Sequence, residues 1–211
     1  MTEADSIGDL ELAALISSRI CHDVISPVGA IANGLEMLDE ESDQAMREQA
    51  MALIRKSAYQ ASAKLQFARL AFGAAGSAGA EIDLRDAERV ARDFVQGPKH
   101  SLSWEGPPAT VPKNKVKLLL NLIAIAVAAL PRGGAVSVKI GGEAPRSSFA
   151  VIAQGEPARL PEHVASLLAG ANGVVLDAHS IQPYYAGRVA AAAGMLVEVE
   201  TREHEVELKA A

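Results

Sequence analysis

The sequence is poor in cysteine, in aromatic residues and in positive charge. Of its 211 residues one is cysteine, 4% are aromatic, and 26 acidic residues outnumber 20 basic ones. A single cysteine, Cys21, excludes an intramolecular disulfide and fits a reducing compartment, where we expect it to be a small packing residue. The net charge of -6 argues against nucleic-acid binding, because phosphate backbones select basic surfaces. Proteins or small molecules are the expected partners.

The chain also lacks a long hydrophobic run. The longest, from Leu118 to Leu130, is interrupted by Asn121 and is shorter than the about 20 residues that span a bilayer. The first residues, MTEADSIGDLEL, are acidic, whereas a signal peptide is basic and then apolar. We therefore expect a cytoplasmic protein with no membrane partner, and a buried helix at the apolar run.

What the first third of the chain does have is the pattern of two amphipathic helices. Seven apolar residues follow one another at alternating spacings of three and four: Met51, Ile54, Ala58, Ala61, Leu65, Ala68 and Phe72. This spacing is typical of a coiled-coil seam. A preceding helix is expected to end near Asp39, with a polar connection from Glu40 to Asp43. Two narrow apolar stripes cannot bury themselves alone, so we predict that two hairpins pair into a four-helix bundle and that the protein is a homodimer.

A histidine lies on the outer face of the first of these helices. The inward stripe is formed by Ile20, Val24, Pro27 and Ile31. At about 100° per residue, His22 points roughly opposite to it. Its neighbours on the outer face are small, so a partner protein could approach the ring closely. These neighbours are Ser18, Ser26, Gly29 and Asn33. Ile25 is apolar on the same wet side, which a protein interface explains better than core packing does.

Pro27 also bears on this histidine. It has no N–H to donate to the carbonyl of Asp23, so it should bend the helix just after His22. The bend is either a tolerated irregularity of a long helix or a feature of the site.

The rest of the chain predicts a second domain. Residues 1–75 are assigned to the hairpin, Gly73 to Ala80 read as a flexible linker of small residues, and residues 81–211 form an α/β sandwich with a mixed sheet, so the fold class is α+β. Helices are expected at 85–96, at 113–130, after Pro161 and at 184–193, and strands at 102–104, 135–140, 149–153, 196–200 and 205–208. Four further histidines show no metal-ligand spacing and stand at strand or loop edges: His100, His163, His179 and His204.

Two stretches resemble histidine kinases of two-component systems. H-D-V-I-S-P-V, from His22 to Val28, is similar to their phosphoacceptor box. N-L-I-A-I-A-V-A-A-L-P-R-G-G, from Asn121, is similar to the N-box of their ATP-binding domain. In those kinases a second asparagine helps to hold Mg²⁺ and an aspartate binds adenine, but Ile125 and Ala153 occupy these positions. Pro157 replaces a glycine of the D-x-G-x-G motif, and the segment before the last helix has no glycine cluster.

A phosphoacceptor hairpin joined to a degenerate kinase domain resembles the ChpT family of bacterial histidine phosphotransferases over essentially the whole chain. The resemblance implies a dimeric phosphorelay intermediate in cell cycle regulation. His22 would accept a phosphoryl group from the receiver domain of a CckA-type hybrid kinase and pass it to response regulators of the CtrA and CpdR types. No cofactor is expected on this chain, and the receiver domain would supply Mg²⁺.

Each of two residues close to His22 has two possible roles. Asp23 either orients the ring or is a solubilising charge, and Arg19 either contacts the phosphoryl group or is a solvated surface charge. Other functions also remain open. The chain could be a divergent kinase, a non-enzymatic dimeric adaptor, or a phosphatase of receiver domains in which Ser26, four residues after His22, positions water.

Overall fold

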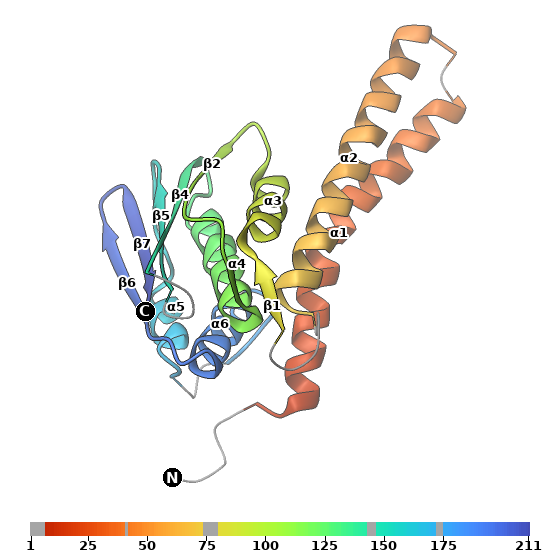
Figure 1. Cartoon of the computed structure of the whole chain (residues 1–211). Helices are drawn as coiled ribbons and strands as arrows, with labels where there is room; N and C mark the ends of the chain where they lie inside the picture. Colours follow the sequence, from red (N-terminus) through yellow and green to blue (C-terminus); the bar gives the residue numbers. More distant parts are fainter. Residues whose placement is uncertain (1–6, 41, 74–79, 143–146, 172–174) are drawn as a thin grey trace.

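The N-terminal part of the protein is an antiparallel helical hairpin. The computed structural model describes residues 7–40, 42–73, 80–142, 147–171 and 175–211. Helix α1 (Asp9–Glu40) and helix α2 (Gln44–Ala71) lie side by side, and their connecting end projects beyond the rest of the molecule (Figure 1). Asp43 caps α2, because its carboxylate accepts a hydrogen bond from the N–H of Met46 at 3.0 Å. The predicted hairpin is confirmed.

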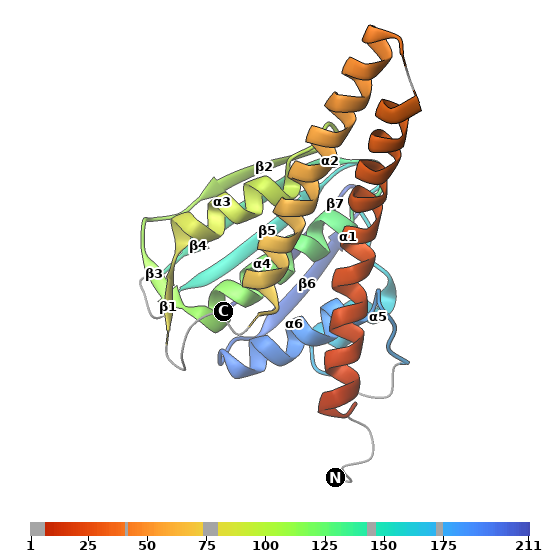
Figure 2. The same cartoon turned by 90° about the vertical axis from the view of Figure 1, so that its right-hand side faces the viewer.

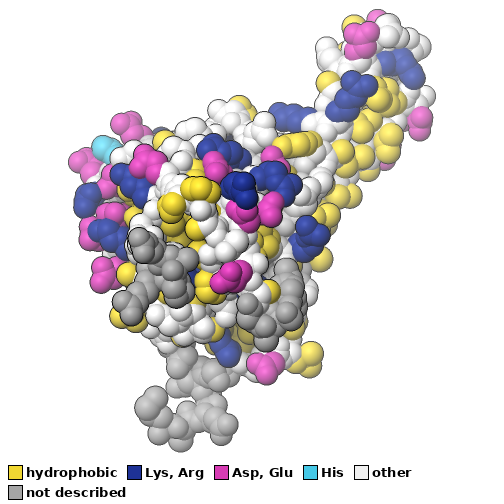
Figure 3. All heavy atoms as spheres, viewed as in Figure 1, with side chains coloured by type: hydrophobic (Ala, Val, Ile, Leu, Met, Phe, Trp, Pro, Cys, Tyr) yellow, Lys and Arg dark blue, Asp and Glu magenta, His cyan; other side chains and the backbone are white. Residues whose placement is uncertain are grey.

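The apolar seam of α2 divides between two sides of that helix. Three of its members face the interior of the folded chain: Ile54, Ala61 and Ala68. Three others are exposed and recur every seven residues: Met51, Ala58 and Leu65. Helix α1 likewise exposes Val28 and Leu35, seven residues apart and each about half exposed. Hydrophobic side chains therefore remain on the surface of the projecting hairpin (Figure 3).

The second part is an α/β sandwich built on a five-stranded sheet. The strand order is β2 (His100–Glu105), β4 (Gly134–Gly141), β5 (Ser148–Gln154), β7 (Glu205–Ala210) and β6 (Val197–Arg202). Strands β2 and β4 are parallel and the other neighbours are antiparallel, so the predicted mixed sheet is confirmed. The helices are α3 (Leu84–Val95), α4 (Lys113–Ala128), α5 (Glu162–Leu168) and α6 (Ile181–Ala192). The fold is α+β, a helical hairpin followed by an α/β sandwich, as predicted.

A second sheet was not predicted. Strands β1 (Glu81–Asp83) and β3 (Thr110–Pro112) form an antiparallel pair. Each has three residues, which is too short for the alternation that identifies a strand. Because the pair is antiparallel, α3 begins at one end of it, where Leu84 N–H donates to the carbonyl of Ala109, and α4 begins at the other, where Lys113 N–H donates to that of Ala80.

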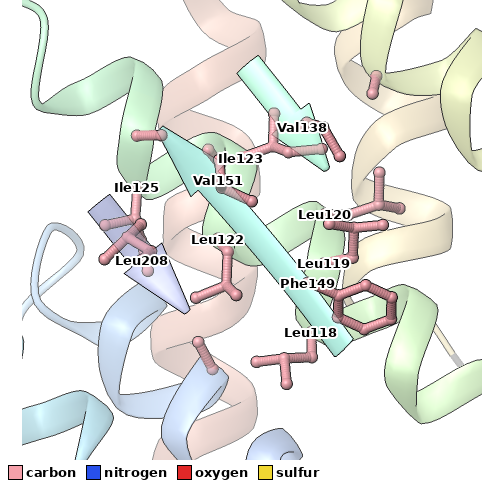
Figure 4. Packing of buried hydrophobic residues seen from close by; sticks show 14 of the residues in the cluster. Leu118, Leu119, Leu120, Leu122, Ile123, Ile125, Val138, Phe149, Val151 and Leu208 are labelled. Atoms are coloured by element: carbon pink, nitrogen blue, oxygen red, sulfur yellow. The ribbon is translucent and has the colours of Figure 1, made fainter. Parts of the chain in front are cut away.

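Helix α4 is buried on every side because it lies between the sheet and the other helices. Leu118, Leu122 and Ile123 have no exposed surface, and they pack with Val138, Val151 and Leu208 of the sheet (Figure 4). A helix with apolar residues all round is stable in water only when it is covered on all sides. The buried helix expected at 118–130 is confirmed, with its end at Ala128.

The hairpin is packed against this sandwich on its helical side, so that α3, α4 and α6 lie between the sheet and the hairpin (Figure 1), and seen from the hairpin side α1 and α2 lie in front of these helices (Figure 2). Phe67 of α2 stacks on Phe94 of α3 with ring centroids 3.9 Å apart. Near the N-terminus, an apolar cluster packs against Leu167 of α5 and against Ile181 and Tyr184 of α6. It is formed by Ile7 and by three residues of α1: Leu12, Leu15 and Ile16. This cluster fixes α1 relative to α6.

Three further expectations have different outcomes. The linker expected at Gly73 to Ala80 lies, at residues 74–79, outside the described part of the chain. Cys21 is exposed in the single chain, so its assignment as a packing residue is wrong. Within the described residues, no helix combines the length and apolar character needed to cross a membrane.

Candidate functional site

The residues predicted around His22 share one face of α1. The His22 side chain is 60% exposed, and Ile25 is 71% exposed. The small residues of this face are also exposed: Ser18, Ser26, Gly29 and Asn33. The inward stripe lies on the opposite side, where Pro27 is buried and Ile20, Val24 and Ile31 are half-buried. The imidazole is therefore open to an approaching molecule.

Asp23 lies between His22 and Arg19 and makes contact with both. Its Oδ2 accepts a hydrogen bond from Arg19 Nε at 3.1 Å, and its Oδ1 is 3.8 Å from His22 Nδ1. The Arg19 side chain is only 19% exposed, so it is not a solvated surface charge. The pair with Arg19 holds the carboxylate beside Nδ1. A negative charge at this place favours the tautomer with the proton on Nδ1 and leaves the lone pair on Nε2.

The second helix contributes Lys64. Pro27 leaves the carbonyl of Asp23 without its helical donor, and Lys64 Nζ donates to that carbonyl at 2.8 Å. This bond ties α1 to α2 one residue after His22. Sequence reasoning found the missing donor but not the side chain that replaces it.

The α/β sandwich contributes a residue that sequence reasoning did not assign to the site. The ring of His179, which precedes α6, makes an edge contact with the ring of His22, with centroids 5.4 Å apart and planes at 77°. No local pattern relates two positions so far apart in the chain. The one available signal was its place in the segment that replaces the glycine-rich loop of kinases.

His179 is held by a turn that Asp177 organises. The Asp177 carboxylate accepts hydrogen bonds from the N–H of His179 at 2.9 Å and of Ser180 at 2.7 Å, and from the Ser180 hydroxyl at 2.8 Å. These bonds lower the pKa of Asp177 to about 2. The carboxylate is therefore charged, and the turn is held, at any physiological pH.

A cavity of about 370 Å³ adjoins this turn. Arg19, Asp177 and His179 lie on its wall together with apolar side chains: Ile125, Ala128, Leu160, Val164, Val175 and Pro183. Ile125, at the place of the magnesium-binding asparagine of kinases, is 4% exposed, and Ala153, at the place of the adenine-binding aspartate, is fully buried. Neither side chain offers an oxygen atom. No group of three or more His, Cys, Asp or Glu side chains in the described residues could hold a metal ion.

A hairpin that presents an exposed histidine, docked on an α/β sandwich with apolar side chains at these two positions, is the arrangement that the sequence resemblance to histidine phosphotransferases predicts. Comparison with known proteins specifies it further. Residues 84–205 match the family model "Histidine phosphotransferase C-terminal domain". The chain is 47% identical over 202 residues to the protein phosphotransferase ChpT of Brucella abortus (strain 2308), covering 95% of both chains.

A solved structure agrees with this assignment. It is described as a bacterial phosphotransferase and superposes with a TM-score of 0.88 at 44% identity, covering 98% of both chains. A looser likeness, with a TM-score of 0.46 at 10% identity over 90% of this chain and 95% of the other, is to the histidine kinase AdeS of Acinetobacter baumannii. The chain belongs to the ChpT family of histidine phosphotransferases, and its function is that of a histidine phosphotransferase in a phosphorelay.

Proposed function

We propose that His22 is the residue that carries the phosphoryl group. The observation that supports this most is the combination at one point of an exposed imidazole and a carboxylate, fixed by Arg19, next to its Nδ1. In the neutral imidazole with its proton on Nδ1, the lone pair of Nε2 is available as a nucleophile. Asp23 orients the ring and is the second residue of the site.

The transfer is a displacement at phosphorus. Nε2 attacks the aspartyl phosphate of a receiver domain, the N–P bond forms, and the P–O bond to the receiver carboxylate breaks and leaves its electron pair on that carboxylate. The proton on Nδ1 stays, and Asp23 balances the positive charge of the phosphorylated imidazolium ring. In the onward step a second receiver's carboxylate attacks the same phosphorus, and the N–P electron pair returns to Nε2. Alignment and charge neutralisation account for most of the catalysis of such a step.

The partners we propose are receiver domains of two-component proteins. The donor is the receiver of a CckA-type hybrid kinase, the acceptors are regulators of the CtrA and CpdR types, and the relay serves cell cycle regulation. The docking surface is the exposed face of α1, where Ile25 offers an apolar contact. Gly29 allows close approach there, because it has no side chain and the space beside it is open: outside the neighbouring helix backbone, nothing in the described chain lies within 4 Å of where its Cβ would stand. Ser18, Ser26 and Asn33 border the surface.

The chain itself needs no nucleotide or metal in this scheme. Mg²⁺ is supplied by the receiver. The apolar side chains at Ile125 and Ala153 support the proposal that ATP with Mg²⁺ binds negligibly. Calorimetric titration with Mg²⁺ and ATP checks this, and micromolar affinity would favour a divergent kinase instead.

The decisive experiment is incubation with a phosphorylated receiver, followed by an acid-lability test for phosphohistidine. His22→Ala should abolish acceptance and keep the fold, because an exposed side chain contributes less than about 0.5 kcal/mol to stability. His204→Ala, at an exposed histidine of the β6–β7 connection, is the matched control. Acceptance by His22→Ala at the wild-type rate would refute the assignment.

A second variant tests the docking face separately. Gly29→Leu adds bulk on the outer face without touching His22, so it should slow transfer while the chain stays folded. An unchanged rate would show that receivers dock elsewhere even if His22 is the acceptor.

The exposed hydroxyl of Ser26, one turn after His22, supports a second candidate function. In it, Ser26 positions a water molecule that hydrolyses the aspartyl phosphate of a receiver. In that case the receiver would lose its phosphate without any phosphohistidine appearing on this chain. Ser26→Ala would then stop the loss, whereas it should leave acceptance by His22 intact.

A further inference from the structure

The α/β sandwich has lost the oxygen ligands of a nucleotide site, yet it presents one imidazole to the proposed acceptor. His22 lies on α1 and His179 lies before α6, and their rings meet edge to face at a centroid distance of 5.4 Å. Edge-to-face packing at this distance is one of the favoured geometries of two aromatic rings. The contact therefore favours one orientation of an otherwise exposed side chain.

The contact is supported from both sides. On the hairpin side, Asp23 approaches Nδ1 of His22 and is itself held by Arg19. On the sandwich side, the carboxylate of Asp177 binds the backbone N–H of His179, so the segment carrying the second ring is fixed. The apolar cluster between α1 and α6 fixes the two helices relative to each other. Two independent groups therefore restrain the His22 ring, one at Nδ1 and one against the ring itself.

The contact leaves the acceptor accessible. With His179 in place the His22 side chain is still 60% exposed, so a receiver can reach the ring without displacing the sandwich. The arrangement thus restrains the ring without covering it.

We propose that His179 is a positioning residue for phosphoryl transfer, which packs against the imidazole of His22 and holds it in the orientation that presents Nε2 to a receiver. The inference rests on the proposed role of His22. It gives the degenerate domain a function in the transfer step, because that domain completes the site that the hairpin begins. Alignment of the attacking atom is the main requirement of the reaction, and displacement by about 1 Å can cost 100-fold in rate.

The test is single-turnover transfer from a phosphorylated receiver, measured over a range of receiver concentrations. His179→Ala should lower the maximal rate about 10-fold and leave the half-saturating receiver concentration unchanged, because the receiver still docks on α1. His179→Phe keeps the ring but no nitrogen, and should retain most of the rate. His163→Ala, at an exposed histidine on the wall of the same cavity, is the control and should behave as the wild type.

A double-mutant cycle adds a second readout. Asp177→Ala releases the backbone of His179 and should slow transfer in the same way, and the double variant should be no slower than His179→Ala alone. Independent effects that multiply would count against a shared mechanism.

Nuclear magnetic resonance of the unphosphorylated protein separates this inference from the proposed function. The ring protons of His22 should shift and sharpen in His179→Ala, since they lose a ring current and gain mobility. If these signals change but His22→Ala still accepts phosphate, the proposed function fails and the contact stands. Unchanged signals, an unchanged rate in His179→Ala, or a loss of rate in His179→Phe equal to that in His179→Ala would overturn the positioning role.

Discussion

At the scale of single residues, Pro27 shows how one missing donor is compensated. A proline inside a helix leaves the carbonyl four residues earlier without a partner, and an unpaired, partly buried carbonyl destabilises the fold. Lys64 from the other helix supplies the bond at 2.8 Å. The sequence was sufficient to predict the exposed face of α1 and the missing donor at Asp23. It could not predict Lys64, because the partner comes from another helix and depends on how the two helices pack.

The bond leads to a prediction about coupled residues. Lys64→Ala should lower the free energy of unfolding by about 1–2 kcal/mol, because the carbonyl of Asp23 loses a charged donor. In a Pro27→Ala background residue 27 regains an N–H that can bond to this carbonyl, so Lys64→Ala should cost less than half as much. Urea unfolding of the four proteins measures the coupling. Lys56→Ala, at an exposed lysine of the same helix, is the control, and equal costs of Lys64→Ala in both backgrounds would contradict the explanation.

At the scale of secondary-structure elements, the two helices of the hairpin are in close contact at Gly34. A Cβ atom there would lie 2.7 Å from Cγ1 of Ile54, whereas a Cβ at Gly29 would meet nothing within 4 Å. Both glycines are in the same helix, so their intrinsic helix propensity is the same. Packing between elements alone distinguishes them, which is why sequence reasoning assigned the outer face to Gly29 but gave no role to Gly34.

The two positions should respond to alanine with opposite signs. Gly29→Ala should stabilise the protein by up to about 1 kcal/mol, the difference in helix propensity. Gly34→Ala should destabilise it by about 1–3 kcal/mol, because the branched side chain of Ile54 cannot move away cheaply. Thermal or urea unfolding gives both values. Adding Ile54→Ala to Gly34→Ala should restore part of the loss, and a stabilising effect of Gly34→Ala alone would show that the helices are not in close contact there.

At the scale of the whole molecule, the element order, the mixed sheet and the buried helix α4 could be predicted, because each follows from a pattern within a short window. The docking of the hairpin on the sandwich could not. It depends on long-range contacts such as the stack of Phe67 on Phe94, and on Asn121, whose side chain donates to the carbonyl of Ala71 at the end of α2. The contact of His179 with His22 belongs to the same category. The sequence pattern of a single chain therefore predicts the helices and strands, but it does not predict the surfaces through which they pack.

The division of the α2 seam bears directly on the proposed homodimer. The sequence pattern treats Ala61 and Leu65 alike, as two steps of one coiled-coil seam. In the folded chain Ala61 is 7% exposed and Leu65 is 49% exposed. Within a single hairpin, the first is therefore part of the fold and the second is free to meet another copy. Exposed apolar residues every seven positions on both helices are what the partner hairpin of a four-helix bundle would cover.

A charge at each position should separate folding from association. Leu65→Glu should give a folded monomer, because the side chain costs little in the single chain but would place a charge between two hairpins. Ala61→Glu should instead lower helix content and thermal stability, since it buries a charge inside one hairpin. Ser62→Glu, at an exposed position beside them, should leave both properties unchanged. Light scattering after size exclusion distinguishes a chain of 22.0 kDa from its dimer, and circular dichroism follows the fold. A Leu65→Glu protein with the mass of a dimer would place the association surface elsewhere, whereas a monomeric Leu65→Glu protein with intact helices would assign the exposed heptad row to the second copy.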